Sequence, residues 1–374
     1  MPEAYIRSFG LIRPGRHYDK SLYDLAWDAL NMLDVKVEPD LLIVSNVFSE
    51  CLSGQADIAT RLASELGFSG RPTIRVETGE TSGLSALELA YKLVSSGAYE
   101  DILVLGVEKL NEYVSQRIYK ELSKLYHSDY ESFIGVSHAA LPALAMKEYM
   151  ARYGVDRKTM ASWPVLMHSN ASGNKFAALR FPVNEDAVVS ANKVSTPLTL
   201  LDTFPLVDGA AAILISSKPN GSYAKITATA HTTGGFAYTH RKDPLIIDSL
   251  RQAYEILLAS EAEGDRIEYV ELTDTFTISA YLILETLGFS APGEAPLDVK
   301  EGKYSPDGEL PVNAGGGLKA RGHPIGATGV YMAAESAGIL SGTLDLNGVS
   351  SSNALLVGVS GLGSNSVILK LKEV

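Results

Sequence analysis

The sequence predicts an α/β protein made of two related halves, and three observations lead to this prediction. Apolar strand-like runs alternate with segments of helical periodicity along most of the chain. Such alternation is typical of sheets whose strands are largely parallel. A similar order of elements occurs twice. The length of 374 residues also exceeds what one hydrophobic core usually organises, which favours two domains or a duplicated architecture.

The predicted strands are short runs rich in Val, Ile, Leu and Ala that turn residues bound on both sides. The predicted helices carry apolar residues three and four positions apart, which places these residues on one face. Strands are expected at residues 40–45, 73–77, 101–107, 210–216, 223–230, 269–272, 353–359 and 366–371. Helices are expected at residues 21–33, 55–66, 82–96, 141–153, 157–168, 278–287 and 329–340.

The repeat is clearest where a predicted helix ends in Leu-Gly-Phe, at residues 66–68 and again at 287–289. In both places a strand follows, and then a hydroxyl residue and a glycine open a helix of small and apolar residues. Two units with matching ends indicate a duplicated α/β half, with chance similarity between strand–helix–strand units as the alternative. The strands that end the two units are Ile-Leu-Val-Leu-Gly-Val (102–107) and Ala-Leu-Leu-Val-Gly-Val (354–359).

The halves are expected at residues 1–218 and 219–374. A stretch at about 110–194 within the first half lacks the alternation and holds Tyr, Lys, Arg and Met at helical spacing. This stretch is too long for a simple connection, and long insertions on α/β cores often cover or build a site. We therefore expect an inserted loop domain there.

Composition excludes several classes of function. The net charge of −12 argues against a nucleic-acid partner and against a polybasic membrane contact. The single cysteine, Cys51, excludes an intramolecular disulfide and fits a reducing cytoplasm, where we expect the protein. The first ten residues lack the apolar segment of a signal peptide, and the uncharged run at 346–369 reads as two strands rather than a membrane span.

The spacing of the histidines does not indicate a metal site. His138, His168, His231 and His240 do not pair with acidic or cysteine residues at the separations that metal ligands require, so no metal is expected. A structural hydrogen bond is the expected role of His168.

The most informative motif is the glycine-dense loop at 313–329, which holds His323 and leads directly into a predicted helix. Glycines let the backbone approach a ligand closely, and a histidine can donate a hydrogen bond or transfer a proton near neutral pH. A tight turn around a buried histidine is the alternative.

The chain as a whole resembles the thiolase superfamily over nearly its entire length. The loop at 313–329 resembles the family signature Asn-x-x-Gly-Gly…Gly-His-Pro-x-Gly-x-Thr-Gly almost position for position. The segments 168–177 and 197–212 resemble the His-x-Asn-Ala…Asn-x-x-Ala and Pro-Leu…Asp-Gly-Ala-Ala-Ala segments of the family. Ser53-Gly54-Gln55 and the compact length are similar to the archaeal and sterol-carrier-linked branch, which includes acetyl-CoA C-acetyltransferase.

The resemblance implies a fold of two duplicated α/β halves stacked as five layers, α-β-α-β-α, with an inserted loop domain. It also implies a homodimer and coenzyme A or an acyl-CoA as ligand or substrate, with no tightly bound cofactor. Archaeal members of this kind assemble with a small zinc-ribbon/oligonucleotide-fold (OB-fold) protein. A complex with a thiolase or a hydroxymethylglutaryl-CoA synthase and such a partner is implied by analogy only.

The resemblance also exposes two departures. Members of the family carry their nucleophilic cysteine in Val-x-x-x-Cys-x-Ser-Gly, and here the same register at 76–83 places Glu80 in the cysteine position. Where relatives have His-Asp-Ala-Phe, this chain has Thr273 and Asp274 at the start of Thr-Asp-Thr-Phe. The implied catalytic set is therefore Glu80, His323, Thr273 and Asp274. Glycines that could line the coenzyme A site or supply backbone donors are Gly79, Gly83, Gly315, Gly316, Gly317, Gly361 and Gly363.

Three functions stay open. The chain could bind acyl-CoA without standard thiolysis or condensation, because a carboxylate nucleophile would form a mixed anhydride of much higher energy than a thioester. It could be an acyltransferase, or a malonyl-type decarboxylase, that uses Glu80 and His323. It could also be a non-catalytic scaffold subunit in which Glu80 only caps a helix.

Overall fold

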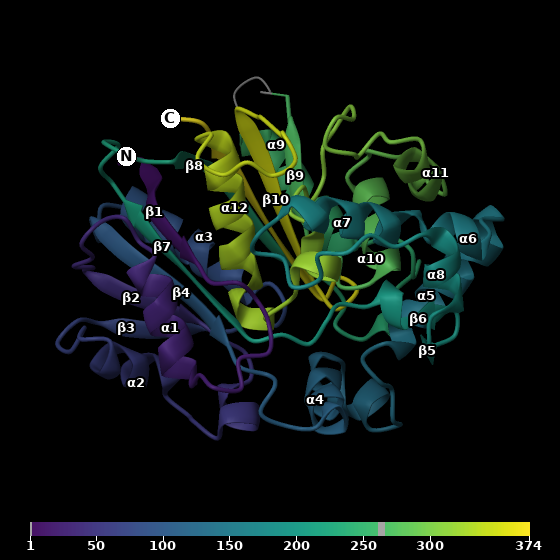
Figure 1. Cartoon of the computed structure of the whole chain (residues 1–374), viewed down its shortest axis with the longest axis horizontal. Coiled ribbons are helices and arrows are strands. Elements are labelled where there is room, and N and C mark those ends of the chain that lie inside the picture. Colours follow the sequence, from purple (N-terminus) through teal and green to yellow (C-terminus); the bar gives the residue numbers. More distant parts are fainter. Residues whose placement is uncertain (1, 261–265) are drawn as a thin grey trace.

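A mixed nine-stranded sheet runs through the computed structural model, which describes residues 2–260 and 266–374. Residues 1 and 261–265, which fall within the two predicted halves, lie outside the described residues. The strand order is β3-β2-β4-β7-β1-β8-β11-β10-β9 (Figure 1). The strands are β1 (Ala4–Leu11), β2 (Leu41–Ser45), β3 (Thr73–Val76), β4 (Asp101–Glu108), β7 (Gly209–Ser216), β8 (Ala224–Thr233), β9 (Tyr269–Leu272), β10 (Asn353–Ser360) and β11 (Asn365–Lys372).

The two halves of the sheet repeat one arrangement, as the sequence predicts. In the first half β2, β4, β7 and β1 lie side by side, and in the second half β9, β10, β11 and β8 do so in the same order. The parallel pair β2–β4 corresponds to the parallel pair β9–β10. Even the edge strand β3 has a counterpart, since Val312 forms an isolated parallel bridge with Val270 of β9. The antiparallel pair β1–β8 joins the halves.

The prediction of a largely parallel sheet is wrong. Only β3–β2, β2–β4 and β10–β9 pair in parallel among the described strands. The pairs β4–β7, β7–β1, β1–β8, β8–β11 and β11–β10 are antiparallel. Alternation predicts crossover helices, but it cannot show that β10 returns as β11 through a short turn, or that β7 comes back from the insertion in the opposite direction.

Helices form the remaining layers and confirm the predicted five-layer fold. On the outer side of the first half, α1 (Leu22–Asn31) packs on β7 and β4, and α2 (Ile58–Glu65) packs on β2 and β3. On the outer side of the second half, α9 (Asp248–Ser260) covers β8 and β11, and α10 (Thr277–Thr286) lies beside it. Between the two half-sheets lie α3 (Ser82–Ser95) and α12 (Thr328–Leu340) (Figure 1).

The central helices cross at a glycine that is the second residue of each, Gly83 in α3 and Gly329 in α12. A Cβ placed on Gly83 would lie 2.6 Å from the backbone nitrogen of Gly329, so neither position has room for a side chain. This close crossing aligns the amino ends of α3 and α12, and the segments that precede them are thereby brought together.

The insertion forms helices that pack on the second half. Here α5 (Ala140–Tyr153) packs on α10, and α7 (Ser162–Gly173) packs on α11 (Ala295–Lys300). The predicted helix 157–168 is split after Met160, because α6 ends there and α7 starts at Ser162. The sequence did not predict the strand β1 or the helix α9. The further elements are α4 (Ser115–Leu122), α5 (Ala140–Tyr153), α6 (Arg157–Met160), α7 (Ser162–Gly173), α8 (Glu185–Ser190), α11 (Ala295–Lys300), β5 (Lys193–Ser195) and β6 (Leu198–Thr199).

The uncharged run at 346–369 contains β10 and most of β11, as expected. Within the described residues, no helix combines the length and the hydrophobicity that crossing a bilayer requires.

Candidate functional site

The two residues that the sequence singles out most strongly lie together where the amino ends of α3 and α12 meet. Glu80 lies two residues before α3, and His323 lies in the glycine-dense loop before α12. Glu80 Oε1 is 3.5 Å from His323 Nε2, and both side chains are fully buried. The structure thus brings the carboxylate and the imidazole into one polar cluster inside the core.

The carboxylate of Glu80 is held from the opposite half of the molecule. Its Oε2 accepts a hydrogen bond of 2.6 Å from the backbone N–H of Gly361, in the turn between β10 and β11. The backbone N–H of Glu80 donates to Ser360 Oγ at 3.2 Å. No side chain caps α3. The alternative that Glu80 only caps its own helix is therefore wrong, because its hydrogen bond goes to a residue 281 positions away.

The other oxygen of this carboxylate faces two imidazoles. His138 Nε2 lies 3.9 Å from Glu80 Oε1, the same oxygen that contacts His323 Nε2 at 3.5 Å. Glu80 Oε1, His323 Nε2 and both ring nitrogens of His138 are buried without a hydrogen-bond partner among the described residues. Buried polar atoms are normally satisfied, so this group is a place where a ligand or water would complete the hydrogen bonding.

His138 is a cluster residue that the sequence did not identify. It lies in the insertion, just before α5, and its ring packs against Tyr126, Phe204 and Phe276. No local spacing connects it to Glu80, which lies 58 positions earlier by residue number. Only the folding of the insertion over the second half places it here.

Protonation in this cluster follows from burial and proximity. Burial lowers the pKa of His138 to about 4, so its imidazole is neutral at pH 7. Burial by itself would raise the pKa of Glu80, but the neighbouring His323 and the Gly361 N–H outweigh burial and hold this pKa below its usual value. Glu80 is therefore an ionised carboxylate beside a neutral His138.

His323 is fixed in orientation by its other ring nitrogen. Nδ1 hydrogen-bonds the hydroxyl of Thr328 at 2.6 Å, at the first residue of α12. The ring of Phe204 packs edge-on against His323, with 4.8 Å between the ring centroids. Nε2 is thereby directed at Glu80.

Thr273 and Asp274 are engaged in hydrogen bonds away from this pair. The Thr273 hydroxyl accepts from the N–H of Val359 at 2.9 Å and donates to the carbonyl of Val359 at 3.3 Å, which ties β9 to β10. Asp274 accepts from Leu318 N–H at 2.7 Å and from Trp163 Nε1 at 2.9 Å. Both residues thus hold the loops of the site, and their catalytic role stays a prediction.

Most of the predicted glycines lie where a side chain would collide with its neighbours. Gly79 has φ +65°, and a Cβ there would lie 2.5 Å from Ser360 Oγ. A Cβ on Gly317 would lie 2.6 Å from Asp274 Oδ1. The coenzyme A contacts assigned to the glycines stay predictions. Of the others, Gly83 lies at the α3–α12 crossing, Gly315 faces Asn174 and Glu335, Gly316 faces Ala171, and Gly361 and Gly363 shape the β10–β11 turn.

The remaining candidates lie outside the cluster. Cys51 Sγ contacts Lys124 Nζ at 3.4 Å, and burial raises the pKa of its thiol. His168 Nδ1 hydrogen-bonds the carbonyl of Phe181 at 3.0 Å, which is the structural role expected of it. Within the described residues, no group of three or more His, Cys, Asp or Glu side chains is arranged to hold a metal ion.

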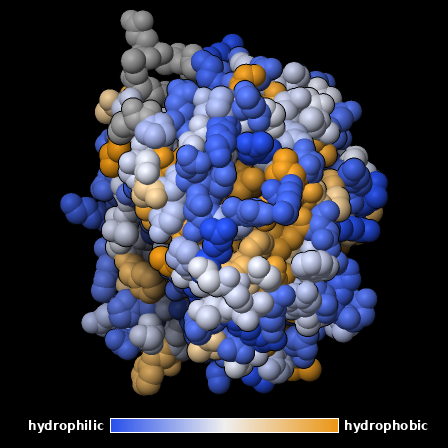
Figure 2. Space-filling model, turned by 90° about the vertical axis from the view of Figure 1, so that its left-hand side faces the viewer, coloured by the Kyte–Doolittle hydropathy of each residue, from blue (hydrophilic) through white to orange (hydrophobic). Residues whose placement is uncertain are grey.

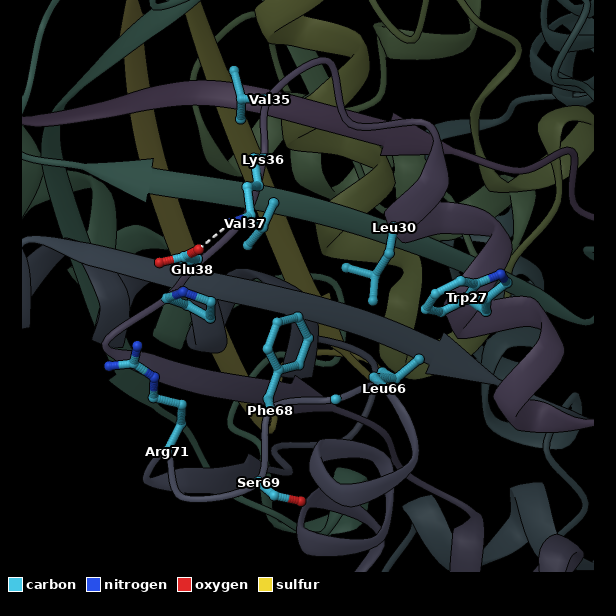
Figure 3. Close-up of a pocket in the computed structure, with 12 residues that line it drawn as sticks. Trp27, Leu30, Val35, Lys36, Val37, Glu38, Leu66, Phe68, Ser69 and Arg71 are labelled. Atoms are coloured by element: carbon cyan, nitrogen blue, oxygen red, sulfur yellow. Dashed lines mark hydrogen bonds and ion pairs between the residues drawn. The ribbon is translucent and has the colours of Figure 1, made fainter.

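A surface pocket of about 540 Å³ lies at the other end of strands β2 and β3 from Glu80. Its lining residues precede β2 and β3, whereas Glu80 follows β3. Trp27, Leu30 and Phe68 line this pocket, and an ion pair between Lys36 and Glu38 lies at its rim (Figure 3). No buried polar atom without a partner is found among its lining residues, so the Glu80 cluster is the better candidate for a functional site.

Fold and site together define a class: a duplicated five-layer α/β protein with a buried polar cluster at the ends of its two central helices. Two family models match the chain, the thiolase N-terminal domain over residues 20–219 and the thiolase C-terminal domain-like family over residues 228–373. The chain belongs to the thiolase superfamily.

Similar proteins agree with this assignment. The acetyl-CoA acetyltransferase of Methanothermobacter thermautotrophicus is 33% identical over 305 residues, which cover 79% of this chain and 78% of that protein. Human sterol carrier protein 2 is 26% identical over 387 residues, which cover 96% of this chain and 70% of that protein. The solved structure titled Ltp2-ChsH2(DUF35) aldolase has a TM-score of 0.82 at 21% identity, covering 98% of this chain and 97% of that chain.

Proposed function

We propose that this chain binds an acyl-CoA thioester at the Glu80–His323 cluster and does not form the covalent acyl-enzyme of a thiolase. One observation carries the proposal: the residue in the position of the nucleophile is an ionised carboxylate whose Oε2 is hydrogen-bonded to Gly361 N–H. Attack by this carboxylate would give a mixed anhydride. The backbone donor that could stabilise a developing oxyanion is already occupied.

Intact-protein mass spectrometry after incubation with acetyl-CoA and acetoacetyl-CoA tests this proposal. We expect no acyl adduct, and we expect free coenzyme A and acyl-CoA to raise the melting temperature at millimolar concentration. A stable acetyl adduct that Glu80→Ala abolishes would refute the absence of an acyl-enzyme. The absence of any thermal shift with either ligand would refute binding.

A second candidate is cleavage of a carbon–carbon bond next to the thioester, by decarboxylation of a malonyl group or by a retro-aldol step. Both reactions leave an enolate of the thioester that must be protonated at carbon. The unpartnered Oε1 of Glu80 and Nε2 of His323 favour this candidate, because they could accept and deliver one proton. The structural neighbour titled an aldolase supports the idea that this fold is not restricted to acyl transfer.

In the retro-aldol form, Glu80 takes the proton of a β-hydroxyl group, the bond between the α- and β-carbons breaks, and a carbonyl compound leaves. The α-carbon then takes a proton from the cluster, so that no oxidant or reductant is needed. Malonyl-CoA and a β-hydroxyacyl-CoA are the two substrates to assay, for carbon dioxide and for an aldehyde respectively. Release of neither product above the level of a Glu80→Ala variant removes this candidate and leaves a binding or scaffold role.

We also propose a homodimer and a cytoplasmic location, with coenzyme A as a dissociable ligand. The dimer proposal is supported by the edge strand β3, which pairs on one side only and exposes Ile74. The side that bears the first half shows apolar residues in a hollow among hydrophilic ones (Figure 2). A partner of the zinc-ribbon/OB-fold kind is supported by the structural neighbour whose title names two components, Ltp2 and ChsH2(DUF35). Light scattering and co-purification test both assemblies.

A further inference from the structure

The helical turn Gly317–Arg321, next to the site, carries a buried amine that the proposed chemistry does not use. The side chain of Lys319 is fully buried, and its Nζ has no hydrogen-bond partner among the described residues. Burial lowers the pKa of this amine to about 8, and the nearby carboxylates of Asp202 and Asp274 offset only part of the effect. At pH 7 the side chain is therefore mainly an ammonium ion without a hydrogen-bonded counterion.

The two nearby carboxylates are engaged with other donors. Asp202 forms an ion pair with Arg157 and also accepts hydrogen bonds from Thr199 and Thr277. Asp274 accepts from Trp163 Nε1, Asn313 Nδ2 and the N–H of Leu318, at distances between 2.7 and 3.2 Å. Because a buried ammonium is costly unless hydrogen-bonded, Lys319 requires an acceptor that these carboxylates do not supply.

Lys319 belongs to the wall of a cavity of about 560 Å³, a size that suits a small ligand, and its Nζ is buried within that wall. The other charged residue in its lining is Arg16, and no carboxylate lines it, although the chain carries a net charge of −12. The lining thus combines positive charge with apolar surface. The apolar side chains of its wall include Leu179, Phe181, Leu200, Leu201, Leu206 and Val207.

One aromatic ring connects this cavity with the Glu80 cluster. Phe204 lines the cavity and packs edge-on against His323, with 4.8 Å between the ring centroids. The same ring contacts His138 at 5.8 Å. The cavity therefore adjoins the cluster, with the ring of Phe204 between them.

We propose that this cavity accepts an acyl group that ends in a carboxylate, and that this carboxylate pairs with the ammonium group of Lys319. The ligand is then the coenzyme A monothioester of a dicarboxylic acid, with its methylene groups against the apolar wall. The inference rests on the proposed function, since it assumes that the chain binds acyl-CoA. An ammonium–carboxylate hydrogen bond is about twice as strong as a neutral one, and a chain ending in a methyl group would leave Lys319 unpaired.

Calorimetric titration at pH 7 with glutaryl-CoA and with pentanoyl-CoA tests this inference, because the two acyl groups have the same number of carbons and differ at the terminus. We expect glutaryl-CoA to bind at least about tenfold more tightly, which corresponds to about 1.4 kcal/mol. Lys319→Met should reduce this preference to less than about twofold and leave the affinity for pentanoyl-CoA unchanged, whereas Lys319→Arg should retain a preference. Lys147→Met, which removes an exposed lysine of α5, is the matched control and should behave as the wild type.

Equal affinity of the wild type for the two thioesters overturns this inference and leaves the proposed function in place. A preference that persists in Lys319→Met also overturns it, because another group would then bind the carboxylate. Failure of both thioesters to bind overturns the proposed function and this inference with it. If Lys319→Met does not fold, the wild-type comparison and Lys319→Arg still decide the question.

Discussion

The neutral state of His138 has a measurable consequence for stability below neutral pH. In the unfolded chain this imidazole has an ordinary pKa of 6.5, and in the fold burial lowers the pKa to about 4. Between these values the unfolded chain binds a proton that the folded protein does not. The contribution of His138 to stability is therefore fully present above about pH 6.5 and is lost as the pH falls toward 4.

The size of this loss follows from the shift. At 1.36 kcal/mol per pKa unit, the full effect is about 3 kcal/mol, of which about 2 kcal/mol is lost by pH 5. The pKa of Glu80 is lowered from a starting value of 4.5, so this carboxylate affects the pH dependence of stability only below pH 5. The interval from pH 7 to pH 5 thus isolates the effect of the imidazole from that of its carboxylate neighbour.

Urea denaturation at pH 7 and pH 5, at one fixed protein concentration, measures the effect. His138→Leu should lose about 2 kcal/mol less than the wild type between these two pH values. His138→Phe, which keeps a ring between Phe204 and Phe276, controls for packing and should behave like the leucine variant. If both variants keep the pH dependence of the wild type, His138 is not the buried neutral group described above, and the electrostatic account of the cluster fails.

Three further predictions concern the site and the core. Glu80→Cys places a thiol beside His323 and should allow mass spectrometry to detect an acetyl adduct formed from acetyl-CoA. If no adduct forms while circular dichroism shows an intact fold, another element of thiolase chemistry is missing. Gly83→Val should destabilise the protein by more than about 3 kcal/mol in urea denaturation, because the valine side chain would collide with the backbone of α12. A loss of stability below about 1 kcal/mol would contradict the close crossing of α3 and α12. Arg321→Met should cost about 3–5 kcal/mol in the same measurement, because Glu335, whose Oε2 lies 2.5 Å from Arg321, would be left as an unpaired buried carboxylate. An unchanged midpoint would contradict this account of the buried ion pair.

The sequence correctly identified Glu80 and His323 as site residues from patterns within a few positions of each. Glu80 and His323 each stand just before a predicted helix that opens with a small residue, so a duplicated fold places them at equivalent helix ends. The same reasoning could not reach His138 or Phe204, because no periodicity shows which face of an insertion will turn toward the core. Thr273 was found as a departure from a motif, but only its bonds to Val359 show that it ties two strands together.

By itself the sequence determined the order of most core strands and of the helices around them, the duplication and the two helix beginnings, since apolar periodicity and small residues act within a few positions of the chain. The tertiary structure alone decided the directions of β7 and β11, the hydrogen bond from Gly361 to Glu80 across 281 positions, and the cavity at Lys319. These features depend on which distant segments pack together, and that packing reflects the free energy of the whole core rather than the preference of any one segment.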